Sequence, residues 1–269
     1  MKRFSDISRG AFLGALLLSA CGGITPGDPH ADGGVPNTLG DGQRIRDISK
    51  PDGPDHKASG ATVTITAAST VIVDNFDETR AGLPRAVYLQ DFGSTAPYSG
   101  VALFRPSFSP TNLHLTPGDV VDLTGTYQEN NSIPTQFPKG EYLIQVADPQ
   151  VSLRYEYKPP TPREINIADL ATYATGRKWL SMLVTVKDVS FPTNASGLAD
   201  DGSGRKTAYI TPSTAQNAPR VTNELFDLGA WNDKTHVIKP GAHLKSLTGV
   251  VTYFFALHIA PRSPEDIEQ

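Results

Sequence analysis

Apolar and polar residues alternate with a period of two over short stretches from Gly60 onward, the pattern of strands that bury one face. Two such runs, at residues 86–91 and 100–104, flank a turn-rich stretch and predict a hairpin. The other predicted strands are at residues 62–66, 70–73, 120–127, 142–146, 179–189, 247–254 and 256–259, with a second hairpin at residues 197–210. Helical spacing occurs at residues 167–173, after a possible cap at Asn166. The pattern therefore predicts an all-β protein.

One signature occurs twice. Pro117-Gly118 followed by Leu-Thr-Gly at residues 123–125 matches Pro240-Gly241 followed by Leu-Thr-Gly at residues 247–249. In both copies a hairpin precedes the Pro-Gly turn and a short strand follows the long one. We therefore predict two copies of one fold, at residues 60–158 and 163–269, joined by a proline-rich segment.

Each copy has the order of a long bent strand, a hairpin, a variable connection, a strand opened by Pro-Gly and a closing strand. This order resembles the OB-fold, a five-stranded Greek-key barrel. The second copy resembles more specifically the OB modules of secreted bacterial proteins and extracellular nucleases, in residues 179–189, 247–253, 259–263 and 266–267. The resemblance implies two tandem OB-fold-like barrels; a generic β-sandwich is the alternative.

The start of the chain predicts export. Residues 1–10 carry three basic residues and one acidic residue, and residues 11–18 form an unbroken run of small and apolar residues. Residues 18–21, Leu-Ser-Ala-Cys, resemble the lipobox of bacterial lipoproteins. The resemblance implies a signal peptide at residues 1–20 and fatty acylation, such as palmitate, at Cys21. An ordinary secretory signal is the alternative.

Two or three acyl chains anchor a protein stably, because each buried CH₂ contributes about 0.8 kcal/mol. With Gly22 after the acylated position, the resemblance implies attachment to the outer membrane of a bacterial envelope. Residues 22–59 hold eight Gly, five Pro and six Asp and few large apolar residues. Such a composition favours a disordered tether over residues 21–59.

Charge argues against a nucleic-acid partner without excluding one. The chain has a formal net charge of −4. Residues 60–159 hold six Lys and Arg against ten Asp and Glu, and residues 160–269 hold eleven of each. Neither half is therefore basic, as a surface that binds phosphates would be. The single cysteine excludes an intramolecular disulfide.

No catalytic residue, metal site or cofactor is predicted. The chain has no Gly-x-Ser-x-Gly elbow, and its six histidines form no closely spaced ligand pair. Five residues are candidates for binding. Tyr88 and Phe104 could form an aromatic face, Arg205 and Lys206 a basic hairpin tip, and Trp231 an anchor in a long connection. Packing in the core, or at a turn, is the alternative for each.

Three functions stay open. The first is a lipid-anchored, non-catalytic binding or scaffold protein of the envelope, with a membrane anchor and a protein partner. The second is a nucleic-acid-binding accessory protein, by analogy with the nuclease-attached modules. The third is a hydrolase whose catalytic residues come from separate loops. The predicted tether and the duplicated barrel favour the first.

Overall fold

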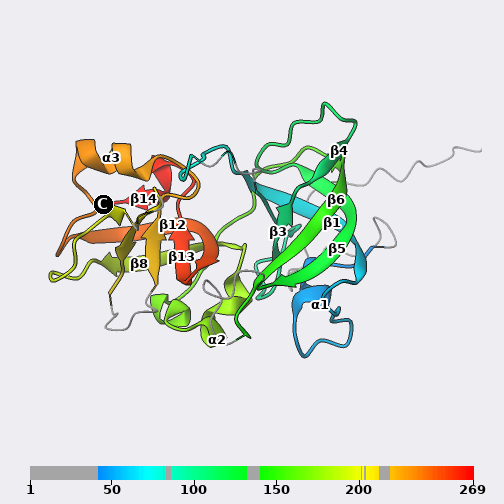
Figure 1. Cartoon of the computed structure of the whole chain (residues 1–269), viewed down its shortest axis with the longest axis horizontal. Coiled ribbons are helices and arrows are strands. Elements are labelled where there is room, and N and C mark those ends of the chain that lie inside the picture. Colours follow the sequence, from blue (N-terminus) through cyan, green and yellow to red (C-terminus); the bar gives the residue numbers. More distant parts are fainter. Residues whose placement is uncertain are drawn as a thin grey trace, which may run out of the picture.

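The computed structural model describes residues 42–80, 82, 86–131, 140–200, 202, 204–211 and 219–269. The predicted signal peptide and Cys21 lie outside these ranges. The described residues form two sheets, one from each half of the chain. Figure 1 shows the first half at the right and the second half at the left.

The first half is a closed five-stranded barrel. Its strands are β1 (Thr62–Val73), β2 (Val87–Asp91), β3 (Gly100–Phe104), β5 (Val120–Asn130) and β6 (Leu143–Tyr155), with β4 (Ser107–Ser109) added beside β6. β1, β2 and β3 pair antiparallel in chain order, and β5 pairs with both β1 and β6. β6 runs parallel to β3 and closes the ring. This is the pairing of an OB-fold, so the predicted fold class is confirmed.

The second half repeats this arrangement. Its strands are β7 (Arg163–Glu164), β8 (Leu183–Ser190), β9 (Ala199–Asp200), β10 (Lys206–Tyr209), β11 (Arg220–Thr222), β12 (His243–Phe254), β13 (Ala256–Ala260) and β14 (Ile267–Glu268). They follow the order β7-β8-β12-β13-β11-β10-β9, and β14 pairs with β12. β11 runs parallel to β13, as β3 does to β6, and a bridge from Ser190 to Thr211 joins β8 to the end of β10.

In the described part of the second half, five short helices lie between the strands or next to them. They are the 3-10 helices η3 (Ile167–Leu170), η4 (Arg177–Trp179) and η5 (Pro264–Asp266) and the α-helices α2 (Tyr173–Gly176) and α3 (Leu228–Thr235). Asn166 caps η3 as predicted, because its side chain accepts a hydrogen bond from Ala168 N at 2.9 Å. β8 begins at Leu183 rather than residue 179, since Trp179 ends η4.

The repeated signature, Pro-Gly followed by Leu-Thr-Gly, has the same structural role in both barrels. Gly118 and Gly241, the turn glycines, have φ values of +104° and +74°, which favour glycine. Gly125 and Gly249 each lie on the long strand opposite the barrel's first strand. A Cβ on Gly249 would lie 2.6 Å from Ala260 O. Glycine therefore permits the close strand approach that a small barrel requires.

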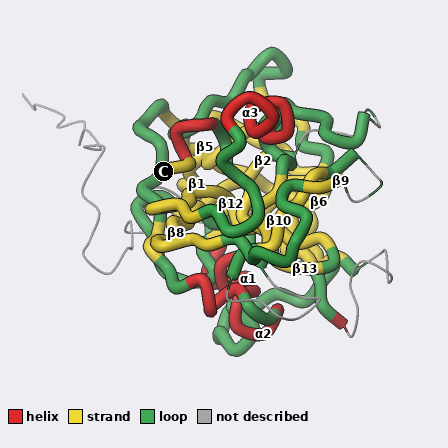
Figure 2. The backbone as a smooth tube through the Cα atoms, turned by 90° about the vertical axis from the view of Figure 1, so that its left-hand side faces the viewer, coloured by secondary structure: helices red, strands yellow, loops and turns green. Residues whose placement is uncertain are grey.

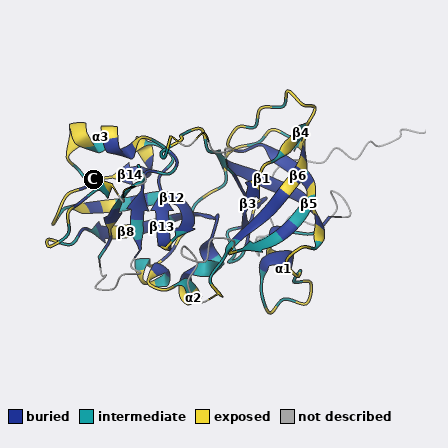
Figure 3. Cartoon of the chain, in the orientation of Figure 1, coloured by how far each residue is buried: buried dark blue, intermediate teal, exposed yellow. Residues whose placement is uncertain are grey.

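The two barrels pack against each other through the β2–β3 face of the first. The apolar contact consists of Val71, Tyr88, Ala102, Leu183, Leu225, Val250 and Ala260. Beside it, the fully buried Gln90 accepts a hydrogen bond from Leu183 N at 3.1 Å. Tyr98 N also donates to Lys178 O at 2.7 Å. The buried colouring accordingly runs through strands of both barrels in Figure 3.

The segment predicted to be a tether is partly folded. Residues 42–59 belong to the first barrel, and α1 (Ile45–Ser49) buries Ile45 and Ile48 completely in its core. The buried Asp91 holds the start of this helix by accepting hydrogen bonds from Ile45 N at 2.7 Å and Arg46 N at 3.0 Å. Figure 2 shows α1 and α2 at one end of the molecule and α3 at the other. The folded unit thus begins by Gly42 rather than at Gly60.

Candidate functional site

A connection between two strands of each barrel approaches the other barrel. In the first barrel it is the connection from β1 to β2, described at residues 74–80, 82 and 86. In the second it is the part of the connection from β8 to β10 that follows β9, described at residues 202, 204 and 205. They approach closely, because a Cβ on Gly204 would lie 2.8 Å from Glu78 O. OB-folds commonly bind ligands with this loop and the adjacent strands. The arrangement therefore brings two potential ligand-binding loops to one place.

A cavity of about 420 Å³ lies between these loops, and we call it the inter-barrel cavity. Among the described residues that line it, the charged ones are Asp74, Asp77, Glu78, Arg205 and Glu224, with Phe76 and Tyr88 beside them. Its volume is within the range of about 300–1,000 Å³ that is usual for small-molecule sites.

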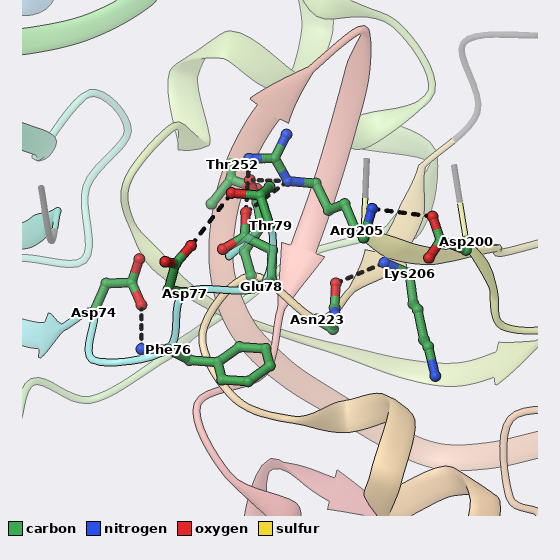
Figure 4. Close-up of polar contacts among 12 residues, drawn as sticks. Asp74, Phe76, Asp77, Glu78, Thr79, Asp200, Arg205, Lys206, Asn223 and Thr252 are labelled. Carbon is green, nitrogen blue, oxygen red and sulfur yellow. Dashed lines mark hydrogen bonds and ion pairs between the residues drawn. The ribbon is translucent and has the colours of Figure 1, made fainter. Parts of the chain in front are cut away.

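Arg205 links the two barrels at this cavity. Its Nε donates to Glu78 Oε1 at 2.8 Å, and a second guanidinium nitrogen lies 2.7 Å from the same oxygen. Glu224 Oε1 lies 3.7 Å from Nε, and the guanidinium sits 4.1 Å from the centre of the Phe254 ring. The Arg205 and Glu78 side chains are only 14% and 9% exposed, so water screens this ion pair weakly. Figure 4 shows Arg205 and Glu78 directed toward each other.

Two aspartates shape the loop that forms the other wall. Asp74 accepts a hydrogen bond from Phe76 N at 3.0 Å, and Asp77 accepts one from Gly82 N at 2.7 Å. These are local turns of the kind that Asp favours. Among the described residues that line the cavity there are four carboxylates and one guanidinium, a formal charge of −4 + 1 = −3 for these residues.

A histidine lies buried in the strands behind Glu224. Thr252 donates a short hydrogen bond to Glu224, and His258 is the cross-strand neighbour of Thr252 on β13. His258 is 1% exposed, and within the described ranges its Nδ1 has no hydrogen-bond partner. Burial, with Arg220 and Arg205 as smaller causes, lowers the pKa of His258 to about 3. This imidazole is therefore neutral at physiological pH.

The structure brings together two of the five predicted binding residues. Tyr88 and Arg205 both line the inter-barrel cavity. Tyr88 is 8% exposed, so it does not belong to an open aromatic face as predicted. Burial, together with Glu224 and Asp74, raises the pKa of Tyr88 well above its usual value. Arg205 lies at a hairpin tip as predicted, but that tip contacts the first barrel.

The other three predicted residues lie elsewhere. Phe104 is 42% exposed at the end of β3. The guanidinium of the next residue, Arg105, lies 4.9 Å from the centre of the Phe104 ring. Lys206 packs beneath α3, since a Cβ on Gly229 would lie 2.6 Å from its Nζ. Trp231 is half-buried on α3 and packs against the core of the second barrel. This position favours packing on the core over a role for Trp231 as an anchor for a partner.

The carboxylates of the cavity were not predicted. The acidic run at residues 74–78 was a visible signal, whereas Glu224 is a single acidic residue between Asn223 and Leu225. Within the described ranges, no three His, Cys, Asp or Glu side chains are arranged to hold a metal ion. Nor does the described part of the chain contain a helix long and apolar enough to cross a membrane.

Comparisons with known proteins add little to the geometry. No known protein family matches the chain, and no curated protein matches it. A chain in the solved structure "Structure and Conformational Change of a Replication Protein A Heterotrimer Bound to ssDNA" is similar at 11% identity and a TM-score of 0.25. The match covers 78% of this chain and 51% of that one, so this chain spans about half its length. A likeness at this TM-score carries no argument about a ligand.

Proposed function

We propose that this chain is a non-catalytic binding protein of the bacterial envelope, whose ligand occupies the inter-barrel cavity. The observation that carries the proposal is the meeting of the two loops around one cavity, with Arg205 and Glu78 fixing their relative position. A preorganised site binds with a smaller loss of conformational entropy than one formed by separate mobile loops. The barrels thus act as rigid supports for the site.

The charge of the cavity favours a cationic ligand. The described residues that line the cavity carry four carboxylates and one guanidinium, so the cavity attracts a cation more than an anion. Phe76 adds a ring that suits contact with an ammonium or guanidinium group. We therefore propose that the site takes a lysine or arginine side chain from a basic segment of an envelope protein.

A lysine-rich peptide tests this proposal. We expect saturable binding that weakens as salt is raised, because the attraction is between charges. The double variant Asp74→Asn/Asp77→Asn should weaken binding about tenfold, roughly 1.4 kcal/mol, while its amide oxygens keep the turn hydrogen bonds. The control is Glu156→Gln/Asp233→Asn, which removes two exposed carboxylates that do not line the cavity. Equal weakening by both double variants would refute a specific site.

We further propose that Cys21 attaches the protein to the membrane through acyl chains. The support is the lipobox resemblance at residues 18–21 and the position of Cys21 as the sole cysteine. Cys21→Ser should move the protein out of the membrane fraction or leave an uncleaved precursor, and fractionation of cells by immunoblot measures this. Unchanged membrane association of the variant, with a mature N-terminus elsewhere, would contradict the assignment.

Single-stranded nucleic acid is the second candidate ligand, and one contact on the second barrel favours it. Arg220 on β11 lies 4.4 Å from the centre of the Tyr209 ring on β10, and Tyr209 is 36% exposed. A cation stacked on an exposed ring suits binding to bases and phosphates. In the same titration, an oligothymidine that binds with a steep salt dependence, when the lysine peptide does not bind, would favour this candidate.

A further inference from the structure

The two barrels differ in how one equivalent end is closed. In the second barrel the connection from β11 to β12 contains α3, and Leu228 of this helix is completely buried in the barrel core. Gly229 of α3 packs on Lys206, at the start of β10. The helix therefore covers the end of the barrel at which β10 begins.

The first barrel has no helix at this place. β2 corresponds to β10 in the OB order, and residues 105–119, all of which the structure describes, connect β3 to β5 with only the short strand β4. In Figure 1, β4 lies in the upper part of the first barrel and α3 in the upper part of the second. Where α3 lies in the second barrel, the first has a cavity of about 370 Å³ that includes Val87, the first residue of β2.

The walls of this cavity are apolar. They are formed by Val73, Val87, Pro106, Phe108, Leu113 and Leu115. Phe108 and Leu115 are only half-buried and pack on the core of the first barrel. Covering such surface is favourable by about 25 cal/mol for each Å² removed from water. The second barrel obtains this cover from its own helix, so the matching occupant of the first barrel is apolar as well.

Polar side chains lie at the open side. Asn75 and His114 are the polar residues among the described ones that line the cavity, and both are exposed. Asn75 also borders the inter-barrel cavity, on the other side of the loop. An occupant would thus meet hydrogen-bonding groups at its outer end and apolar side chains along the rest of its length.

We infer that this second cavity binds a single-chain amphiphile, with its hydrocarbon tail between Phe108 and Leu113 and its polar head near His114. The volume lies near the lower end of the range for small-molecule sites, which fits one medium-length chain rather than a two-chain lipid. The site is independent of the ligand proposed for the inter-barrel cavity, because the chemistry of the two cavities is opposite.

Decanol is a suitable probe, measured by calorimetry on the full chain carrying Cys21→Ser, so that neither attached acyl chains nor detergent compete. We expect saturable binding with one site per chain. Leu113→Trp should reduce the affinity at least tenfold by filling the cavity. Leu153→Trp, on an exposed position of β6 outside the cavity, should bind as the parent does.

A second ligand tests the apolar inner end. In 1,10-decanediol one hydroxyl must enter the inner end, where the side chains of the described lining residues are apolar, and burying an unpaired hydroxyl is costly. We expect the diol to bind at least tenfold more weakly than decanol. The inference is overturned if decanol does not saturate, if Leu113→Trp binds it as well as Leu153→Trp does, or if the diol binds as tightly as decanol.

Discussion

Replacing Gly100 with valine will separate the two barrels. A Cβ at this position would lie 2.5 Å from Leu180 O and 2.7 Å from Met182 N, both backbone atoms of the second barrel. That backbone cannot move aside cheaply, because Ser181 N donates to Val251 O at 2.7 Å and Val251 N donates to Met182 O at 3.0 Å. The added side chain must therefore push the barrels apart.

The expected loss of stability is about 3 kcal/mol or more, in the range of severe core overpacking. Separation removes the hydrogen bond from Leu183 N to Gln90 and exposes the apolar contact around Tyr88 and Val250. Urea unfolding should show a lower first midpoint in the variant and a second transition as one barrel unfolds before the other. Because valine also changes β-propensity, Thr62→Val at an exposed position of β1 serves as the control and should be nearly neutral. A single transition with the parent midpoint in Gly100→Val would show that the contact tolerates the side chain.

The architecture could be predicted because it depends on local pattern. Alternation within residues 62–66 and 86–91 reflects one face on a core, and this holds whatever the barrel packs against. Gly118 and Gly241 both have a positive φ in the turn before the long strand of their barrel, so the repeat could be found without a structure. The hairpin predicted at residues 86–104 is present as β2 and β3.

The beginning of the folded unit could not be predicted in this way. Ile45 and Ile48 lie three residues apart, a helical spacing, but among many Gly, Pro and Asp residues. What folds the segment is distant in sequence, namely the first barrel's core and the Asp91 side chain. The amino-acid composition of residues 21–59 is an average over the whole segment, so it could not show that Ile45 and Ile48 are fully buried.

The site was predictable in part for a similar reason. Arg205 was identified by its charge at a hairpin tip, yet its partner Glu78 lies 127 residues away on the other barrel. The alternation of apolar and polar residues within each half does not predict which faces of the two barrels pack against each other. The docking buries Tyr88, which sequence reasoning placed on an open face, and creates the inter-barrel cavity.

Acidification will weaken the fold through His258. The pKa of this histidine is lowered to about 3 in the folded chain, chiefly by burial, against about 6.5 when unfolded. Below pH 6.5 the unfolded chain takes up a proton that the folded chain does not bind until near pH 3. Stability is therefore full above pH 6.5 and is lost as pH falls through this interval. Between pH 7.5 and pH 5 the expected loss is about 2 kcal/mol.

The comparison of His258→Gln with the parent isolates this effect, because the amide keeps hydrogen-bonding capacity without titrating. The pKa of Asp91, raised to about 6 mainly by burial, gives a pH dependence of opposite sign, but it is common to both proteins and cancels in the difference. Urea unfolding at the two pH values should show that the parent loses about 2 kcal/mol more than His258→Gln. His243→Gln, on an exposed position of β12, should keep the parent's pH dependence. If His258→Gln loses as much stability as the parent between the two pH values, protonation of His258 does not weaken the fold, and the lowered pKa of this imidazole is contradicted.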